Sequence, residues 1–395
     1  NGKELKANQI KVDGQTITLT LTEEQVKENG GKAVNLTFTA KIKANADLTP
    51  YLTPAGKTEV PNKASYKASF PNKPEVNKDS NEVPVTPPTP NEPEIKKDVN
   101  DKEAATLDKR DEVFTYNVTT EVPQAATAFE VHDTLVDVLE FAGSSSASVN
   151  GKAIAPEQIK VEGQTITLTL TEDQVKANAG KAVKLSFTAK IKKGANLSAY
   201  ITKDGKTEVP NKASYKVDFP NKPGVTKDSN TVPVTPPTPG EPEIKKDVNG
   251  KPAETLQTRN EEFTYHVNTE VPADATAFEV HDTLVDVLEF ADGTGRATAT
   301  LGEEALAPEQ IKVDGQKITV TLTEDQVKAN AGKAVNLTFT AKIKDGANLS
   351  AYVTKEGKTE VPNKASYKAS FPNKPGVTKD SNEVPVTPPS PELPP

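Results

Sequence analysis

The feature that most constrains this chain is an internal repeat of about 150 residues. The string PNKASYK begins at Pro61, Pro210 and Pro362, so its successive copies lie 149 and 152 residues apart. The strings EPEIKKDVN and FEVHDTLVDVLEF each occur twice, again 149 residues apart. Repetition at a fixed period is typical of tandem structural units. Any fold proposed for the chain must therefore be built from copies of one module.

Proline-rich joints separate the copies. VPVTPPTPNEPE and VPVTPPTPGEPE follow the first and second copies, and VPVTPPSPELPP closes the chain. Such segments favour extended polyproline geometry, so we expect modules placed end to end in a monomeric rod. The phase of the repeat divides the chain into the C-terminal part of a truncated repeat (1–92), a complete repeat (93–241) and a second complete repeat with a proline-rich tail (242–395). In the second, GTGRATATLGEEAL replaces the shorter SSSASVNGKAI, which predicts a longer surface-loop tip.

Within each module, most segments have the pattern of β-strands. The segment VEGQTITLTLT, which begins at Val161, alternates apolar residues with threonine, and KAVKLSFTAKIK, FTYNVTTEVP and NKASYKVDFP alternate in the same way. One short helix is predicted in EDQVKANAG, which follows a capping box at Thr171 and ends at Gly180. Many short strands with turns between them predict an all-β fold of tandem immunoglobulin-like β-sandwich modules, each with one short helix.

Composition excludes several functional classes. The chain has no Cys, which excludes disulfides, thiolate metal sites and a cysteine nucleophile, and we expect no metal or other cofactor. A net charge of −8 disfavours binding to nucleic acid or to an anionic membrane. No stretch approaches the roughly 18 apolar residues of a membrane span. Because the chain also lacks Met, we expect a fragment whose signal and anchor lie outside it.

In the first complete repeat, three polar residues fall on the core side of the period-2 alternation. Lys97 in EIKKDVN, Asp133 in AFEVHDTL and Asn211 in PNKASYKVDF each share the parity of the apolar residues around them. The second complete repeat places three corresponding residues in the same way: Lys246, Asp282 and Asn363. Because buried charges and amides are costly unless they are partnered, we expect the three residues of each repeat to meet.

Such a trio has a specific chemical capacity. Burial lowers the pKa of a lysine and raises the pKa of an aspartic acid, which favours a neutral amine beside a protonated carboxyl group. The amine can then attack the asparagine amide carbon while the acid polarises its carbonyl, so that ammonia leaves and an isopeptide bond remains. This hypothesis makes Asp133 and Asp282 catalytic, and it joins Lys97 to Asn211 and Lys246 to Asn363.

Alternatives remain open from the sequence. The trio could be an ordinary hydrogen-bonded network, and Asn230, near the last strand, is a rival for Asn211. The truncated repeat keeps Asn62 but lacks the segments that carry Lys and Asp, so Asn62 should stay unbonded and residues 1–92 should be the least stable part. His132 and His281 have outward parity and no Ser or Cys partner, so they are expected to face solvent, and no enzyme acting on an external substrate is predicted.

The segments EIKKDVN, F-x-V-x-D-T-L and V-P-N-K-A carry a resemblance to a known family. Each complete repeat resembles the isopeptide-forming immunoglobulin-like domains of Gram-positive pilins and adhesins, in which a first-strand Lys bonds to a late-strand Asn beside a catalytic Asp or Glu. The period and the VTPP joints are most similar to the streptococcal surface repeats (SSURE) of fibronectin- and plasminogen-binding adhesins.

The resemblance implies a virulence-associated protein anchored in the cell wall at the streptococcal surface. It also implies that the repeats bind host extracellular matrix, with fibronectin and plasminogen as partners. The alternative function is a purely structural stalk that projects a distal adhesive domain. Near-identity of the copies suits a stalk, because a spacer needs only length.

Overall fold

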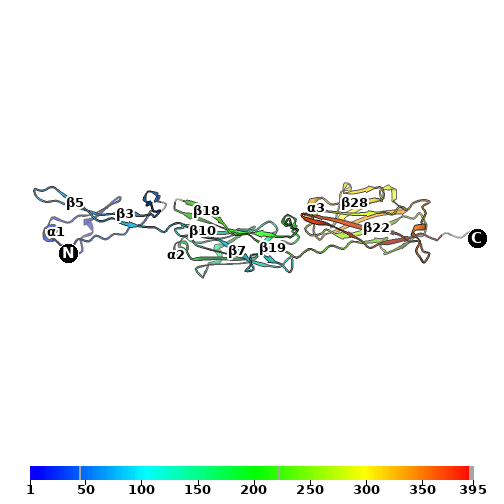
Figure 1. Ribbon diagram of the computed structural model, residues 1–395, viewed down its shortest axis with the longest axis horizontal. Helices are drawn as coiled ribbons and strands as arrows, with labels where there is room; N and C mark the ends of the chain where they lie inside the picture. Colours follow the sequence, from blue (N-terminus) through cyan, green and yellow to red (C-terminus); the bar gives the residue numbers. More distant parts are fainter. Residues whose placement is uncertain (44–45, 221, 391–395) are drawn as a thin grey trace, which may run out of the picture. The chain divides into compact units, whose positions relative to one another are not determined.

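The computed structural model describes residues 1–43, 46–220 and 222–390, and the chain forms two compact units, residues 1–86 and 87–395. The second unit contains the two complete repeats, and Figure 1 shows that each repeat is a stack of β-sheets with one short helix. Apolar residues alternate with polar ones along these strands, so each sheet buries one face. The predicted all-β fold of immunoglobulin-like sandwich modules is confirmed.

The first complete repeat has two five-stranded sheets and one three-stranded sheet. Their strand orders are β12-β11-β15-β9-β7, β13-β14-β10-β17-β18 and β16-β19-β8, and the pairing is antiparallel except between β19 and β8. The strands are β7 (Lys96–Val99), β8 (Ala105–Thr106), β9 (Phe114–Glu121), β10 (Ala128–Thr134), β11 (Leu139–Val149), β12 (Lys152–Ala153), β13 (Ile159–Glu162), β14 (Thr165–Thr169), β15 (Ala182–Ile191), β16 (Val209–Asn211), β17 (Ala213–Phe219), β18 (Lys222–Asp228) and β19 (Val232–Thr235).

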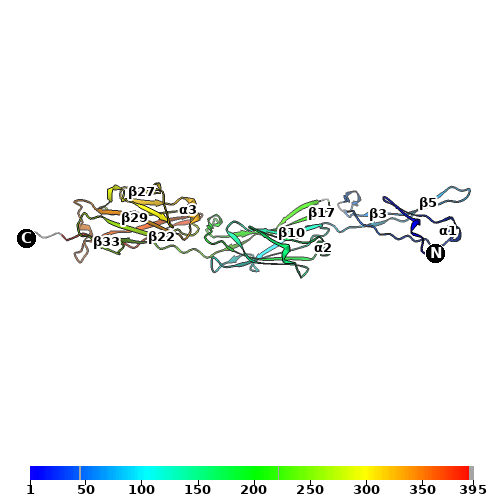
Figure 2. The ribbon, with the colours of Figure 1, turned by 180° about the vertical axis from the view of Figure 1, so that it is seen from behind.

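The second complete repeat has the same plan, seen from both sides in Figures 1 and 2. Its sheets are β20-β22-β29-β25-β26, with β24 also paired to β29, then β27-β28-β23-β31-β32 and β21-β33-β30. The strands are β20 (Lys245–Val248), β21 (Glu254–Thr255), β22 (Phe263–Glu270), β23 (Ala277–Thr283), β24 (Leu288–Phe290), β25 (Thr298–Leu301), β26 (Glu304–Ala305), β27 (Ile311–Asp314), β28 (Lys317–Thr321), β29 (Ala334–Ile343), β30 (Val361–Asn363), β31 (Ala365–Phe371), β32 (Lys374–Asp380) and β33 (Val384–Thr387).

Each complete repeat has its own hydrophobic core between its sheets. One core draws on buried residues from Ile95 to Val234, and the other on buried residues from Ile244 to Val386. Strand β15 illustrates the predicted alternation, because every second residue from Val183 to Ile191 is buried and the residues between them are not. Because of this alternation, a polar residue at an inward-facing position of a strand lies inside the core.

The predicted short helix is present in every copy. It spans Glu172–Ala177 (α2) and Glu324–Ala329 (α3) in the complete repeats. At α2 the capping box forms as the sequence predicted, since the Gln174 backbone N–H donates to the Thr171 hydroxyl and the Thr171 N–H donates to the Gln174 side chain. Short 3-10 turns also occur at Pro156–Gln158, Ser198–Tyr200, Ala291–Gly293, Pro308–Gln310 and Ser350–Tyr352.

The prediction that the inserted residues extend a loop tip was wrong. In the first complete repeat, β11 is one long strand with an irregularity between Phe141 and Ser145. In the second, the corresponding chain is split into β24 and β25 by the 3-10 turn Ala291–Gly293. The additional residues therefore enlarge an existing bulge within a strand, which a sheet tolerates because a bulge leaves the flanking pairing intact.

The first unit contains the truncated repeat. Its elements are β1 (Ile10–Asp13), β2 (Thr16–Leu19), α1 (Glu23–Glu28), β3 (Val60–Asn62), β4 (Ser65–Ala68), β5 (Val76–Asp79) and β6 (Val83–Val85), with 3-10 turns at Ala7–Gln9 and Thr49–Tyr51. Among its described residues none is buried, and Tyr66 is 55% exposed where its counterpart Tyr215 is fully buried. This unit lacks the strands that would cover its apolar side chains.

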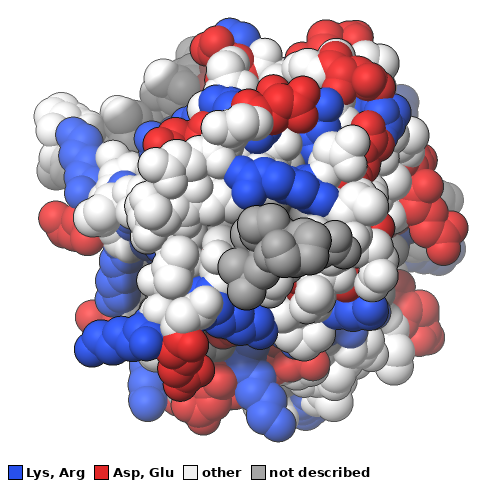
Figure 3. Space-filling model, turned by 90° about the vertical axis from the view of Figure 1, so that its right-hand side faces the viewer, with Lys and Arg blue, Asp and Glu red and all other residues white. Residues whose placement is uncertain are grey.

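Charged side chains of both signs are interspersed on one face of the molecule. Figure 3 shows Lys and Arg beside Asp and Glu across the end of the molecule that it views. Over the described residues, no helix is long enough and apolar enough to cross a bilayer.

Candidate functional site: a buried Lys–Asp–Asn trio in each complete repeat

The trio of the first complete repeat is built from both large sheets. Lys97 lies on β7 at the edge of one sheet, and Asp133 lies on β10 in the centre of the other. The Lys97 Nζ lies 2.5 Å from the Asp133 Oδ2, and both side chains are 0% exposed. The neighbouring Lys96 is exposed, so the sequence alternation correctly identified which lysine enters the core.

Strand register brings the asparagine to the same place. Asp133 is paired with Ala213 across β10 and β17, and Asn211 precedes Ala213 by two residues at the end of β16. Residues two apart on an extended chain share a face. Asn211 is accordingly buried, at 3% exposure, whereas the corresponding Asn62 of the truncated repeat is exposed.

Aromatic rings enclose the lysine amine. The Lys97 Nζ lies 4.0 Å from the centroid of the Tyr116 ring and 4.9 Å from that of Phe187. The two rings come from the neighbouring strands β9 and β15 and contact each other. They exclude water from the amine, and their faces attract its charged form, which offsets part of the cost of burying it.

Burial shifts the pKa values of both ionisable groups toward a neutral pair. It lowers the pKa of Lys97, against the opposing effect of the Asp133 charge and hydrogen bond. It also raises the pKa of Asp133, an effect opposed by Lys97 and, more weakly, by the Asn211 amide. When the one proton of the pair resides on the carboxyl group, the lysine is a free amine, which is the nucleophilic form.

The Asn211 amide lacks the partners that a buried amide normally has. Neither its Nδ2 nor its Oδ1 has a hydrogen-bond partner among the described residues, and the same holds for Asp133 Oδ1. The amide lies close enough to Asp133 to influence its pKa, but outside hydrogen-bonding geometry. Unsatisfied buried polar groups cost about 1–3 kcal/mol each, so this arrangement is costly as an ordinary network.

Asn230, the rival asparagine of the sequence analysis, has a different position. Its Oδ1 accepts a hydrogen bond from the Lys97 backbone N–H at 2.8 Å, and its Nδ2 donates to the Lys97 carbonyl at 2.9 Å. Both polar atoms of its amide are therefore engaged with the main chain. Asn230 holds the backbone of Lys97 as a neighbouring strand would, on the open edge of β7.

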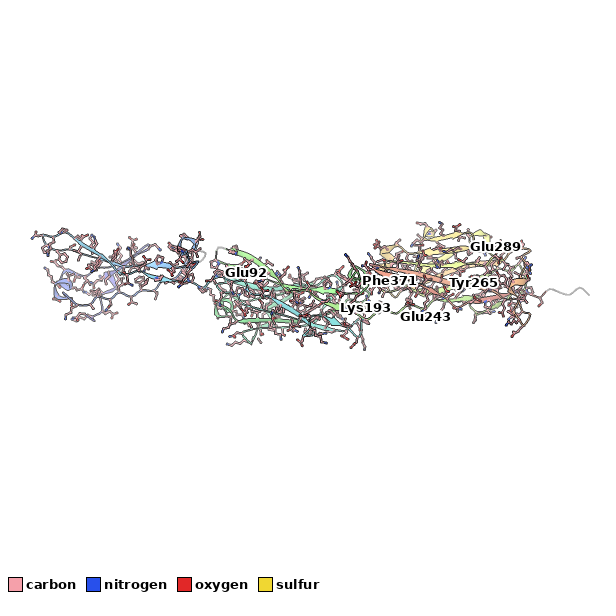
Figure 4. All side chains as sticks on the ribbon, viewed as in Figure 1. Glu92, Lys193, Glu243, Tyr265, Glu289 and Phe371 are labelled. Atoms are coloured by element: carbon pink, nitrogen blue, oxygen red, sulfur yellow. The ribbon has the colours of Figure 1, made fainter. Side chains whose placement is uncertain are left out.

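The second complete repeat reproduces this site. The Lys246 Nζ lies 2.6 Å from the Asp282 Oδ2, both side chains are 0% exposed, and the Asn363 amide again has no partner among the described residues. The Lys246 amine lies 3.9 Å from the Tyr265 ring centroid and 4.9 Å from that of Phe339. Asn382 exchanges two 2.9 Å hydrogen bonds with the Lys246 backbone. Figure 4 places Tyr265 within the body of this repeat.

The aromatic enclosure and the backbone clamp were not predicted from the sequence. The inward parity of Tyr116 could have indicated the first, because FTYNVTTEVP alternates as clearly as the strands that carry the trio. His132 and His281 lie between the two extremes of exposure rather than fully in solvent, and burial lowers the pKa of His281. In the described part of the chain, no cluster of three or more His, Asp or Glu residues could hold a metal ion.

The sheets and the buried trios define a class: a tandem array of immunoglobulin-like β-sandwich repeats, each with a Lys–Asp–Asn site closed off from solvent. No family model matches the chain. The chain is 61% identical over 394 residues to platelet adherence protein A of Streptococcus gordonii. The match covers 99% of this chain and 11% of that protein, so the chain is homologous to a short segment of a streptococcal adhesin.

Solved structures with weaker likeness are pilins and adhesins of Gram-positive bacteria. They include the major pilin subunit BcpA of Bacillus cereus, with a TM-score of 0.34 and 15% identity over 75% of this chain and 69% of that one. The N-terminal domain of the Streptococcus gordonii adhesin Sgo0707 has a TM-score of 0.30 and 12% identity over 70% and 61% of the two chains. At such scores, the fold is defined by the strand orders and registers described above.

Proposed function

We propose that each complete repeat forms an intramolecular isopeptide bond, between Lys97 and Asn211 and between Lys246 and Asn363. The neutral Lys97 amine attacks the Asn211 Cγ, and the Nζ–Cγ bond forms as the Cγ–Nδ2 bond breaks. Asp133, carrying the proton, polarises the amide oxygen and then relays protons to the departing nitrogen. The products are one amide cross-link and one molecule of ammonia, and the carboxyl group of Asp133 is regenerated.

The observation that carries this proposal is the wholly buried Lys–Asp pair beside an amide that has no hydrogen-bond partner. A structural network would be expected to satisfy the buried amide, because leaving it unpaired is costly. The aromatic enclosure also favours the reaction, since it holds the amine in a dry site where its charged form is disfavoured.

Intact mass tests the chemistry. The chain should be lighter than its sequence by two molecules of ammonia, and an Asp133→Ala, Asp282→Ala variant should have the mass of its own sequence. Lys96→Ala is the matched control, since it removes an exposed lysine next to the reactive one and should leave both bonds in place. A wild-type mass equal to that of the sequence would refute the proposal.

At the level of the organism, we propose that the chain is a segment of a cell-wall-anchored streptococcal adhesin of the SSURE type, whose repeats bind fibronectin and plasminogen. Homology to a platelet adherence protein supports a role at the host interface and adds platelets to the proposed targets. The purified chain should bind immobilised fibronectin and plasminogen saturably, above an unrelated isopeptide-containing module. The absence of saturable binding to both would contradict it.

The second candidate is a structural stalk. It is favoured by the fact that the chemistry of each repeat is internal, while the face seen in Figure 3 mixes charges of both signs without a single-sign patch. A stalk predicts that deleting one complete repeat shortens the reach of a longer protein but leaves adhesion by its other domains intact. A matrix-binding role predicts that adhesion falls with each repeat deleted.

A further inference from the structure

Besides a 3.1 Å hydrogen bond from the Asn373 side chain to the Ile201 carbonyl, the two complete repeats contact each other through the carboxylate of Asp274. Both of its oxygens accept hydrogen bonds at 2.8 Å from the guanidinium of Arg110, and Oδ1 also accepts one at 2.8 Å from the backbone N–H of Leu197. The Asp274 side chain is 3% exposed. A bidentate Arg–carboxylate pair is directional as well as strong, so this contact fixes an orientation.

The residues around Asp274 complete a receiving site, which we call the socket: Arg110, Ala195, Asn196 and Leu197. Arg110 also donates to the Ala195 carbonyl at 2.7 Å, and the Asn196 side chain donates to the carbonyl of Ala275 at 2.9 Å. The socket therefore binds two consecutive residues, through the carboxylate of Asp274 and the backbone carbonyl of Ala275. Figure 4 shows Lys193, two residues before Ala195, at the end of its repeat nearest Phe371 of the other.

The second complete repeat carries the same socket, formed by Arg259, Ala347, Asn348 and Leu349. Arg259 donates to the Ala347 carbonyl, and the Ser350 N–H donates to Asn348 Oδ1 at 3.0 Å as the Ser198 N–H donates to Asn196 Oδ1 at 2.9 Å. Arg259 and Asn348 are exposed, whereas Arg110 and Asn196 are partly covered. The socket thus has its shape before anything enters it.

The loop that enters the socket is also preformed. Asp274 has a φ of 65°, and Ala125, at the corresponding position of the first complete repeat, has a φ of 64°. The left-handed conformation is unfavourable for alanine, yet Ala125 adopts it. The conformation is therefore imposed by the loop and does not depend on the aspartate. The two loops differ in what they offer, because Ala125 has no carboxylate for an arginine to bind.

We propose that the socket at the end of each complete repeat is a docking site for the following repeat, and that the residue at position 274 of the loop decides whether the two lock together. An aspartate followed by alanine, as at Asp274 and Ala275, holds the two repeats in one orientation. With an alanine at position 274, only the proline-rich linker restrains that orientation. The exposed socket around Arg259 takes as its partner a further repeat of this type with aspartate in the loop. The order of loop residues along an array of such repeats then determines which joints are stiff.

Single-molecule fluorescence transfer on the full chain tests this proposal. Because the chain has no cysteine, Glu157→Cys and Glu309→Cys place two dyes on exposed sites of the two complete repeats without competing thiols. We expect one narrow transfer distribution for this labelled chain, and a broadened or shifted one when Asp274→Ala or Arg110→Ala is added. Asp274→Ala introduces the residue that the other repeat carries at the same φ, so the repeat should keep its fold, which circular dichroism and intact mass verify.

Arg259→Ala is the matched control, because it removes the same arginine from the socket of the second complete repeat and should leave the distribution unchanged. In a chain extended by another copy of residues 242–395, with the dyes moved to flank the new joint, Arg259→Ala should broaden the distribution. An unchanged distribution in Asp274→Ala and Arg110→Ala would overturn the proposal, as would an equal effect of Arg259→Ala in the unextended chain.

Discussion

Replacing Asn211 by alanine should remove the cross-link and leave the rest of the core in place. The Lys97–Asp133 pair keeps both partners in this variant, so no buried charge is left alone, and the principal loss is the covalent bond. Lys97 and Asn211 are 114 positions apart in the sequence. A cross-link that closes a loop of that length restricts the unfolded chain by about 4.8 kcal/mol in the loop-entropy treatment.

For a module of this size, each kcal/mol changes the melting temperature by about 2–4 °C, so the first complete repeat should melt about 10–20 °C lower in the variant. Calorimetry of the full chain is the appropriate assay, because the second complete repeat retains Asn363 and provides an internal reference. Its transition should stay where it is while the other moves. If both transitions keep their wild-type temperatures, or if the wild-type chain shows no mass deficit, the reasoning from the buried trio is refuted.

Two further predictions concern the surroundings of the site, and a third concerns the first unit. Asp133→Ala leaves Lys97 buried with its pKa below the usual 10.5, so the unfolded chain binds more protons in the interval between the two values. Stability should therefore rise with pH up to about 10.5, by at most about 1.4 kcal/mol per unit, and flat urea midpoints would contradict this. Asn230→Ala removes both hydrogen bonds to the Lys97 backbone and should cost about 2 kcal/mol of stability. Intact mass should then show a fraction of molecules without the cross-link in the first complete repeat, while Asn382→Ala should have this effect only in the second. Limited proteolysis should cleave residues 1–86 first, and resistance equal to that of 87–395 would be inconsistent with their exposed apolar side chains.

Much of the fold was predictable because its signals are local. The alternation in KAVKLSFTAKIK determines which face β15 buries, and the capping box at Thr171 determines where α2 begins. Alternation also placed Lys97, Asp133 and Asn211 on core faces, since strand parity depends only on neighbours in the sequence.

The remaining features depend on contacts between distant segments. The clamp between Asn230 and the Lys97 backbone joins residues 133 positions apart, and nothing in DSNTVPV distinguishes a backbone clamp from a reactive amide. The inserted residues near Gly295 were misread as a loop tip because a bulge is recognised by the pairing on either side of it, here with β29. The role of Asp274 was equally hidden, because its partner Arg110 belongs to the other repeat.

Peptide mapping of the digested wild-type chain tests the central claim most directly. It should yield two branched peptides, one joining the segment that contains Lys97 to the segment that contains Asn211, and one joining those of Lys246 and Asn363, each one ammonia lighter than the sum of its parts. Recovery of all four segments as separate, unmodified peptides would contradict the account, and a branch at Asn230 in place of Asn211 would show that the wrong asparagine had been assigned.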